Sequence, residues 1–162
     1  MEKITYRINY IRCSYEELSE EERKLTDAAK NATHGSYAPY SKFCVGAAAL
    51  LADGTVIIGA NQENAAYPSG LCAERTALFS AGATHPGTPV TALAIAAYTN
   101  GKFLSKPVTP CGSCRQVLAE TEARFGTAVK IILYGTDYCL VFDKGSSDLL
   151  PFGFDEEYLD RP

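Results

Sequence analysis

Hydrophobic residues in the first third of the chain alternate with polar ones in some segments and recur with helical spacing in others. Residues 4–12 partly alternate, which predicts a short strand. Residues 14–17 and 19–22 both have the pattern of a helix capping box. A helix from about residue 20 to 33 follows, ending at Gly35. Its inner face would be formed by Leu25, Ala28, Ala29 and Ala32.

The remaining elements follow from the same patterns. Residues 43–51 and 56–60 flank Asp53-Gly54, a strong hairpin signal. Residues 71–81 predict a helix with Ser69 as its cap and Gly82 as its stop, and Pro110 suits the first turn of another helix that runs to about residue 123. Further strands are predicted at 90–98, 129–134 and 139–142, and an irregular or short helical tail at 149–162.

Helices inserted between buried strands are typical of an α/β fold. We expect a single layered domain, with a mixed sheet of about five strands covered by helices. The run at 90–98 is almost entirely apolar, so this strand should be buried on both faces. The sequence shows no repeat and no linker, which predicts one domain over residues 1–162.

Composition narrows the possible partners. The chain is 46% hydrophobic and 21% charged, as in soluble globular proteins. The net charge is −4, and basic residues are scattered singly, which argues against a nucleic-acid partner and favours a small neutral substrate. No apolar run is long enough to span a membrane, and residues 1–20 do not follow the plan of a signal peptide. We therefore expect a cytoplasmic protein without a membrane partner.

Two short cysteine clusters carry the candidate chemistry. Cys72 begins one predicted helix, and Cys111 and Cys114 lie at the start of another. Helix N-termini stabilise thiolates, and the thiolate is the form that binds zinc. If the two helix starts meet, their three sulfur atoms would hold one Zn²⁺ per chain and leave the fourth tetrahedral position open, as in catalytic zinc sites.

Two other interpretations of the cysteines remain open at this point. A thioredoxin-like dithiol normally follows the first strand of a βαβ unit, which the 111–114 motif does not. A closed structural zinc site would need a fourth ligand, for which the chain offers Cys13, Cys44, Cys139, His34 and His85. Cys44 and Cys139 lie in apolar strand patterns typical of core residues, and both histidines lie near predicted loops.

Glu74 favours a catalytic site. It lies two residues after Cys72 in an otherwise apolar helix start. A glutamate facing solvent is the simpler interpretation. From this position, however, the side chain could reach the open face of the metal without binding it. A zinc-bound water of lowered pKa needs such a base to take its proton.

Cys-Ala-Glu at 72–74 followed by Pro-Cys-x-x-Cys at 110–114 is the signature of zinc deaminases of nucleobases. Within that group the sequence resembles the small, homotetrameric cytidine deaminases over about residues 20–154. The resemblance includes residues 39–43, 45–48, 61–67, 72–77, 110–118 and 149–151. It implies hydrolytic deamination of cytidine or 2′-deoxycytidine to the uridine product and ammonia, with Glu74 carrying protons first to ring N3 and then to the departing amine.

The resemblance also implies the substrate contacts. The pyrimidine would stack on Phe43, and Asn61 and Glu63 would hold the ribose hydroxyls. The backbone N–H of Ala73 would donate to the 2-oxo group, and a carbonyl near Thr109 would accept from the exocyclic amine. From the residues alone, Phe43 is typical of a core position, and Asn61 and Glu63 of a polar loop.

Three further residues complete the candidate site. Zinc with three thiolates has a formal charge of −1, so we expect the Arg75 guanidinium to draw charge from the sulfur atoms and restore the acidity of the bound water. Tyr67 and Phe154 match aromatic residues that, in the family's tetramers, reach into a neighbouring subunit's pocket. By that resemblance the protein is a homotetramer with shared active sites, although both residues could instead pack locally.

Three features depart from the family pattern. Residues 1–18 form an N-terminal extension, Gln62 replaces a usually apolar residue, and residues 102–106 form a small insertion that we expect near the pocket rim. Alternative functions are deamination of another cytosine-bearing compound, polynucleotide editing, or a zinc-stabilised binding module without turnover. The free ribose hydroxyls implied by Asn61 and Glu63, the cysteine at position 72 and the acidic charge favour the nucleoside.

Overall fold

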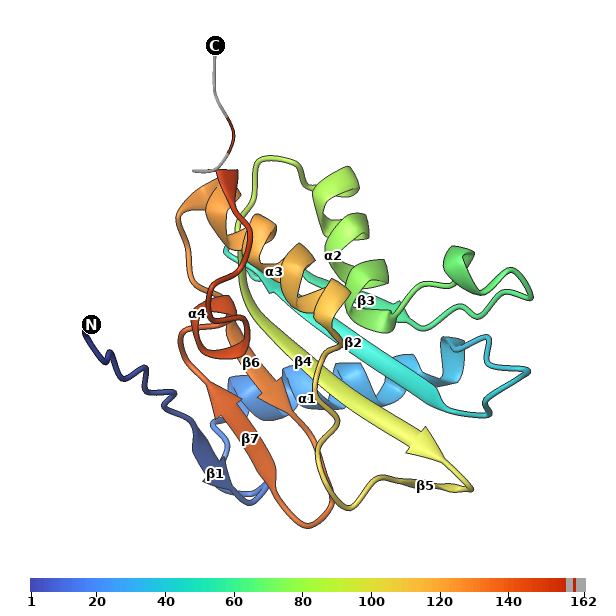
Figure 1. Cartoon of the computed structure of the whole chain (residues 1–162). Coiled ribbons are helices and arrows are strands. Elements are labelled where there is room, and N and C mark those ends of the chain that lie inside the picture. The colour runs from blue at the N-terminus through green and yellow to red at the C-terminus, as the bar shows by residue number, and fades with distance from the viewer. Residues whose placement is uncertain (157–158, 160–162) are drawn as a thin grey trace.

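The computed structural model describes residues 1–156 and 159 and has a single sheet between layers of helices (Figure 1). The strands lie in the order β1-β7-β6-β4-β2-β3, and β5 pairs with β4. Neighbouring strands are antiparallel except β4 and β6, which are parallel. The mixed, helix-covered α/β sheet is therefore confirmed, with seven strands rather than about five. The strands are β1 (Ile11–Cys13), β2 (Cys44–Leu51), β3 (Val56–Ala60), β4 (Val90–Thr99), β5 (Lys102–Phe103), β6 (Lys130–Leu133) and β7 (Cys139–Phe142).

The helices divide between the two faces of the sheet. On one face α1 (Glu20–Ala32) packs against β2 and β4, with Leu25 and Ala29 buried beneath it. The other face carries α2 (Ala73–Thr84), α3 (Gly112–Phe125) and the short α4 (Ser146–Leu149) (Figure 1). Two core clusters, one on each side, therefore bury the central strand β4 on both faces, as its apolar run predicts.

Local signals predict several element ends correctly. Ser19 is the N-cap of α1, and it forms the full capping box with Glu22. Asp53-Gly54 closes the β2–β3 hairpin, with Gly54 at a φ of 87°. Cys72, not Ser69, is the N-cap of α2, and the helix continues past Gly82 to Thr84. Pro110 precedes α3, whose N-cap is Cys111 and whose end is set by Gly126 in the left-handed conformation.

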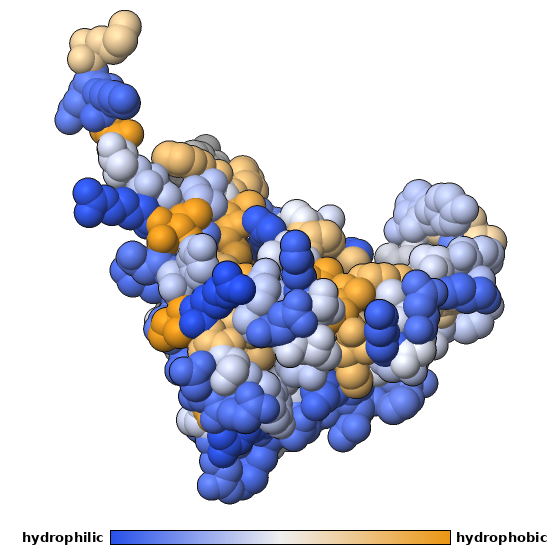
Figure 2. Space-filling model, turned by 90° about the horizontal axis from the view of Figure 1, so that it is seen from below, coloured by the Kyte–Doolittle hydropathy of each residue, from blue (hydrophilic) through white to orange (hydrophobic). Residues whose placement is uncertain are grey.

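The N-terminal strand is shorter than predicted because its partner ends. Only residues 11–13 pair with β7, in the register Ile11↔Val141 to Cys13↔Cys139. Since β7 ends at Phe142, one residue past the Ile11↔Val141 pair, residues 4–9 lie beyond the end of β7. The large side chains of Ile4, Tyr6, Ile8 and Tyr10 are exposed. This extension projects from the body of the protein, with hydrophobic and hydrophilic residues alternating along it (Figure 2).

The insertion at 102–106 contains the missed strand β5. Asn100 and Gly101 have φ angles of 51° and 78°, so they form the tight turn that joins β4 to β5. Phe103 and Tyr15, one from the insertion and one from the N-terminal extension, both lie beside the ammonium of Lys30, at 5.7 and 4.9 Å from the ring centroids. The two additions to the family pattern are therefore packed around one lysine of α1.

The chain ends in an irregular segment after α4, as predicted. Residues 157, 158 and 160–162 of the predicted tail lie outside the described residues. Within the part of the chain that the structure describes, no helix has the length and apolar character needed to cross a membrane.

Candidate zinc site and nucleoside cleft

Two helix starts bring the three predicted thiols together. Cys72 and Cys111 are the N-caps of α2 and α3, and Cys114 is buried in the first turn of α3. The Cys72 and Cys111 Sγ atoms are 3.7 Å apart, those of Cys111 and Cys114 are 3.4 Å apart, and all three lie within 4.8 Å of one another. In the described residues this is the one group of cysteine, histidine and acidic side chains with such spacing.

The spacing of the sulfur atoms fits a zinc ion. Zn–S bonds of about 2.3 Å in a tetrahedral arrangement place neighbouring sulfur atoms about 3.8 Å apart. The Cys72–Cys111 and Cys111–Cys114 sulfur separations, 3.7 and 3.4 Å, are close to that value. His34, His85, Cys13, Cys44 and Cys139 do not join the group. The chain thus offers three sulfur ligands and no fourth protein ligand from the candidates that the sequence suggested.

The electrostatics of the cluster favour a thiolate at Cys72. The Cys114 thiol and the Arg75 guanidinium, whose Nη2 lies 3.7 Å from the Cys72 sulfur, lower the pKa of Cys72 to about 5 against the opposing effect of burial. Cys114 has a raised pKa, because the Cys72 thiolate is its hydrogen-bond partner and because it is buried. A negative charge on the Cys72 sulfur would stabilise a bound metal cation.

Glu74 is buried next to the thiols. It lies in the first turn of α2 and is only 5% exposed. Burial is the main cause of its raised pKa, and the negative charge of Cys72 adds to it. A raised pKa makes a carboxyl group a better proton acceptor, which suits a general acid–base.

A cleft of about 620 Å³ opens beside Cys72, within the size range of small-molecule sites. It is lined by residues 40, 41, 61–64, 67, 70–72 and 75. Of the predicted site residues, Asn61, Glu63, Tyr67, Cys72 and Arg75 line it. The insertion at 102–106 does not, so the expectation that it lies at the rim of this cleft is not supported.

Two polar residues of the cleft are already held by backbone groups. Asn61 accepts from the N–H of Val45 at 2.8 Å and donates to the carbonyl of Phe43 at 2.9 Å. The Glu63 carboxylate accepts from the hydroxyl of Ser41 and from the N–H of Tyr40, and these bonds lower its pKa. Both side chains therefore brace the chain before β2, which includes Phe43. Neither role could be predicted from the sequence, because the partners are about 20 residues away along the chain.

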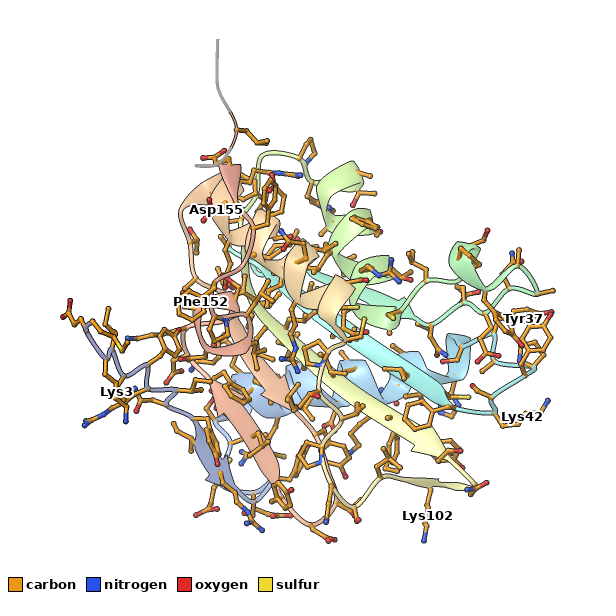
Figure 3. The ribbon with its side chains drawn as sticks, in the orientation of Figure 1. Lys3, Tyr37, Lys42, Lys102, Phe152 and Asp155 are labelled. Atoms are coloured by element: carbon orange, nitrogen blue, oxygen red, sulfur yellow. The ribbon has the colours of Figure 1, made fainter. Side chains whose placement is uncertain are left out.

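Phe43 and Phe154 are not among the residues that line the cleft. Phe43 is half-buried immediately before β2, and Ala73 is fully buried at the start of α2. Phe154 is 57% exposed, and its carbonyl accepts from Gln116 of α3. Tyr37, whose backbone bonds to Asn61 and Glu63, and Asp155, which follows Phe154, lie toward opposite sides of the molecule (Figure 3).

The sequence model of one protein family covers most of the chain. Residues 19–129 match the model described as the cytidine and deoxycytidylate deaminase zinc-binding region. This chain belongs to that family. The matched segment contains both cysteine clusters and Glu74, and its start coincides with the Ser19 cap of α1. The N-terminal extension lies outside it.

Individual deaminases agree with the family match. A cytidine deaminase of Halalkalibacterium halodurans is 52% identical over 96 residues, which are 59% of this chain and 68% of the relative. A probable cytidine deaminase of Dictyostelium discoideum is 34% identical over 140 residues, 86% of this chain and 88% of the relative. The crystal structure of cytidine deaminase from Burkholderia pseudomallei superposes with a TM-score of 0.67 at 39% identity, covering 85% of this chain and all of that one.

Proposed function

We propose that the protein is a zinc-dependent cytidine deaminase, which converts cytidine or 2′-deoxycytidine and water to the uridine product and ammonia. The observation that carries this proposal is the buried Glu74 beside three thiols at the meeting point of two helix starts, in a chain of the deaminase family. In the family's context this chemistry belongs to pyrimidine salvage. We also propose that residues 1–162 form a single domain and that the protein acts in the cytoplasm.

We assign the roles of the residues as follows. Cys72, Cys111 and Cys114 would hold the metal, which when bound would supply a water of lowered pKa. The Glu74 carboxylate would take up a proton, deliver it to ring N3, and later protonate the departing amine. Ring N3 and the amine both gain protons as the flat base becomes tetrahedral, so Glu74 interacts more strongly with the transition state than with the substrate.

Asn61 and Glu63 line the cleft and accept from the ribose hydroxyls. Beyond the cleft lining, Phe43 stacks on the pyrimidine and the Ala73 N–H donates to its 2-oxo group, as the family resemblance implies. The bonds of Asn61 and Glu63 to the backbone around 40–45 support this role, because they fix both side chains before the substrate arrives. Each still has unused hydrogen-bonding capacity for a hydroxyl.

A panel of compounds tests the proposed function. Zinc-loaded protein is mixed with cytidine, 2′-deoxycytidine, cytosine, CMP and dCMP, and the ultraviolet spectrum is followed, with Glu74→Ala as the blank. Turnover of the nucleosides supports the proposal. A flat trace for all five compounds from protein with one zinc per chain would favour a binding module. Turnover of CMP or dCMP alone would make a nucleotide, rather than a nucleoside, the substrate of this deaminase.

Arg75 gives a further prediction. Its guanidinium lies 3.7 Å from the Cys72 sulfur, and that sulfur in turn raises the pKa of the arginine. We expect Arg75→Ala to keep its zinc but to lower kcat about 10- to 100-fold, in the range of substitutions beside metal ligands. Arg75→Lys, which keeps the charge, should recover part of the loss. The zinc content and the steady-state kcat of each variant are measured. Wild-type kinetics in the alanine variant would show that Arg75 has no role in the mechanism.

The active sites are shared between subunits of a homotetramer in our proposal. Tyr67 is 78% exposed at the cleft, while Phe154 is exposed and adjoins Asp155, which lies away from the cleft side of its own subunit (Figure 3). Large exposed aromatic side chains are typical of residues that bind a partner. Phe154 of one subunit would therefore complete the pocket of another.

Mixing two inactive variants tests this arrangement. Glu74→Gln and Phe154→Ala subunits, unfolded together and refolded with zinc, should regain activity, because mixed tetramers contain sites with a wild-type glutamate and a wild-type phenylalanine. Each variant refolded alone is the control. A sum of the two separate activities would contradict the shared site, as would a monomer of full activity in analytical ultracentrifugation.

A further inference from the structure

Two cysteines outside the zinc site lie opposite each other on neighbouring strands. Cys13 ends β1, and its register partner on β7 is Cys139. Both side chains belong to the same core cluster on the α1 side of the sheet, where Cys139 is fully buried and Cys13 is partly buried. Their proximity also appears in the electrostatics, since Cys13 contributes to the raised pKa of Cys139.

The geometry of an antiparallel pair is compatible with a disulfide. Directly opposed residues have Cα atoms about 4.5 or 5.5 Å apart, depending on their hydrogen bonding, and both values lie inside the range of about 4.4–6.8 Å seen in disulfides. Their side chains project to the same face of the sheet. The pair needs only side-chain rotation and a small adjustment of the backbone at the end of a three-residue strand.

We propose that Cys13 and Cys139 form an oxidisable cross-strand pair that fastens the N-terminal extension to the edge of the sheet. The oxidant is a low-molecular-weight disulfide such as oxidised glutathione. The thiolate of Cys13, the more exposed of the two, attacks it, forming a mixed disulfide and releasing one reduced glutathione. The Cys139 thiolate then attacks the Cys13 sulfur and displaces the second. Two protein thiols are oxidised and one disulfide molecule is reduced to two thiols.

The bond would strengthen a short strand pairing, since only three residue pairs join β1 to β7. Before β1, the contacts of the extension include the Tyr6 ring with Phe152 and the Tyr10 ring with Phe142. The pair does not serve the zinc site, because neither cysteine belongs to the metal-binding group. Burial raises the pKa of both thiols, so thiolates are scarce at neutral pH and the exchange is slow. The redox poise decides which form is present: a reducing glutathione buffer favours the two thiols, and an excess of oxidised glutathione favours the disulfide.

The test uses zinc-loaded full-length protein, in which the metal protects the three ligand thiols. After equilibration with oxidised glutathione, free thiols are blocked and the protein is digested without reduction. We expect a peptide pair joined through Cys13 and Cys139, unchanged zinc content, and activity within about twofold of the reduced enzyme. Because the bond closes a loop across most of the chain, the thermal midpoint should rise by about 5 °C or more.

Three variants make the result specific. Cys13→Ser and Cys139→Ser should both lose the linked peptide and the thermal shift, whereas Cys44→Ser should keep them, since Cys44 pairs with Tyr98 rather than with a cysteine. Cys13 is only partly buried, so its variant should fold even if the Cys139 variant does not. The proposal is overturned if Cys13 stops at the mixed disulfide, or if the thermal shift persists in Cys13→Ser.

Discussion

Replacing Glu74 with glutamine is expected to lower kcat at least about 1,000-fold while leaving zinc bound and the fold intact. Glutamine has the size of glutamate but cannot carry a proton, and general acid–base catalysis contributes roughly 10²–10⁴ in rate. In the proposed mechanism, one carboxyl group performs more than one proton transfer. The loss should appear in kcat, because the substrate contacts assigned to Asn61 and Glu63 are untouched. Steady-state kinetics on cytidine and metal analysis of the same sample provide the measurement.

The matched control is Glu120→Gln. Glu120 lies on the exposed surface of α3, away from the thiols, so its variant should have wild-type kinetics. Turnover of Glu74→Gln within tenfold of wild type would mean that another group moves the protons. A loss of zinc together with activity would instead give Glu74 a structural role in the metal site.

The second large effect is expected at Gly59, where β3 passes beneath α2. A Cβ atom at this position would lie 2.4 Å from the Ala77 nitrogen and 2.5 Å from the Ala73 carbonyl oxygen. Backbone atoms of a helix cannot yield to such contacts without moving the helix. Gly59→Ala should therefore lower the free energy of unfolding by about 3 kcal/mol or more, or prevent folding. It should also disturb the cluster, since α2 carries Glu74 and begins at Cys72.

Gly87→Ala is the control for the Gly59 variant. A methyl group added at Gly87 would have no atom within 4 Å, so the Gly87→Ala protein should unfold at nearly the same urea concentration as the wild type. Urea unfolding of both variants compares the two positions directly. A Gly59→Ala protein of wild-type stability would show that α2 does not pack on β3 as closely as described.

The sequence predicts the structure best where a residue pattern is compatible with only a few local structures or sites. Cysteines and a glutamate at two helix starts favour a catalytic zinc site if those helix starts meet, and the structure brings Cys72, Cys111 and Cys114 together as expected. The apolar run of β4 and the Asp53-Gly54 turn were similarly predictable. The strand and turn signals are local, whereas the meeting of Cys72 with Cys111, 39 positions further along the chain, depends on how α2 and α3 pack.

Predictions were wrong or incomplete where a distant partner decides the outcome. The first strand is limited by the end of β7, more than 100 residues away along the chain. The short strand β5 follows the turn at Asn100-Gly101, a signal that is present in the sequence. The bracing of residues 40–45 by Asn61 and Glu63, like the opposition of Cys13 and Cys139, depends on strand register, which hydrophobic patterns do not specify across long separations.

The central claim is that three sulfur atoms from two helix starts hold one metal with an open position under Glu74. X-ray absorption at the zinc edge of the purified protein tests it most directly. The predicted spectrum has three sulfur atoms at about 2.3 Å and one oxygen or nitrogen at about 2.0 Å, with one zinc per chain. Four sulfur ligands would indicate a closed structural site, and folded, active protein without metal would contradict the account altogether.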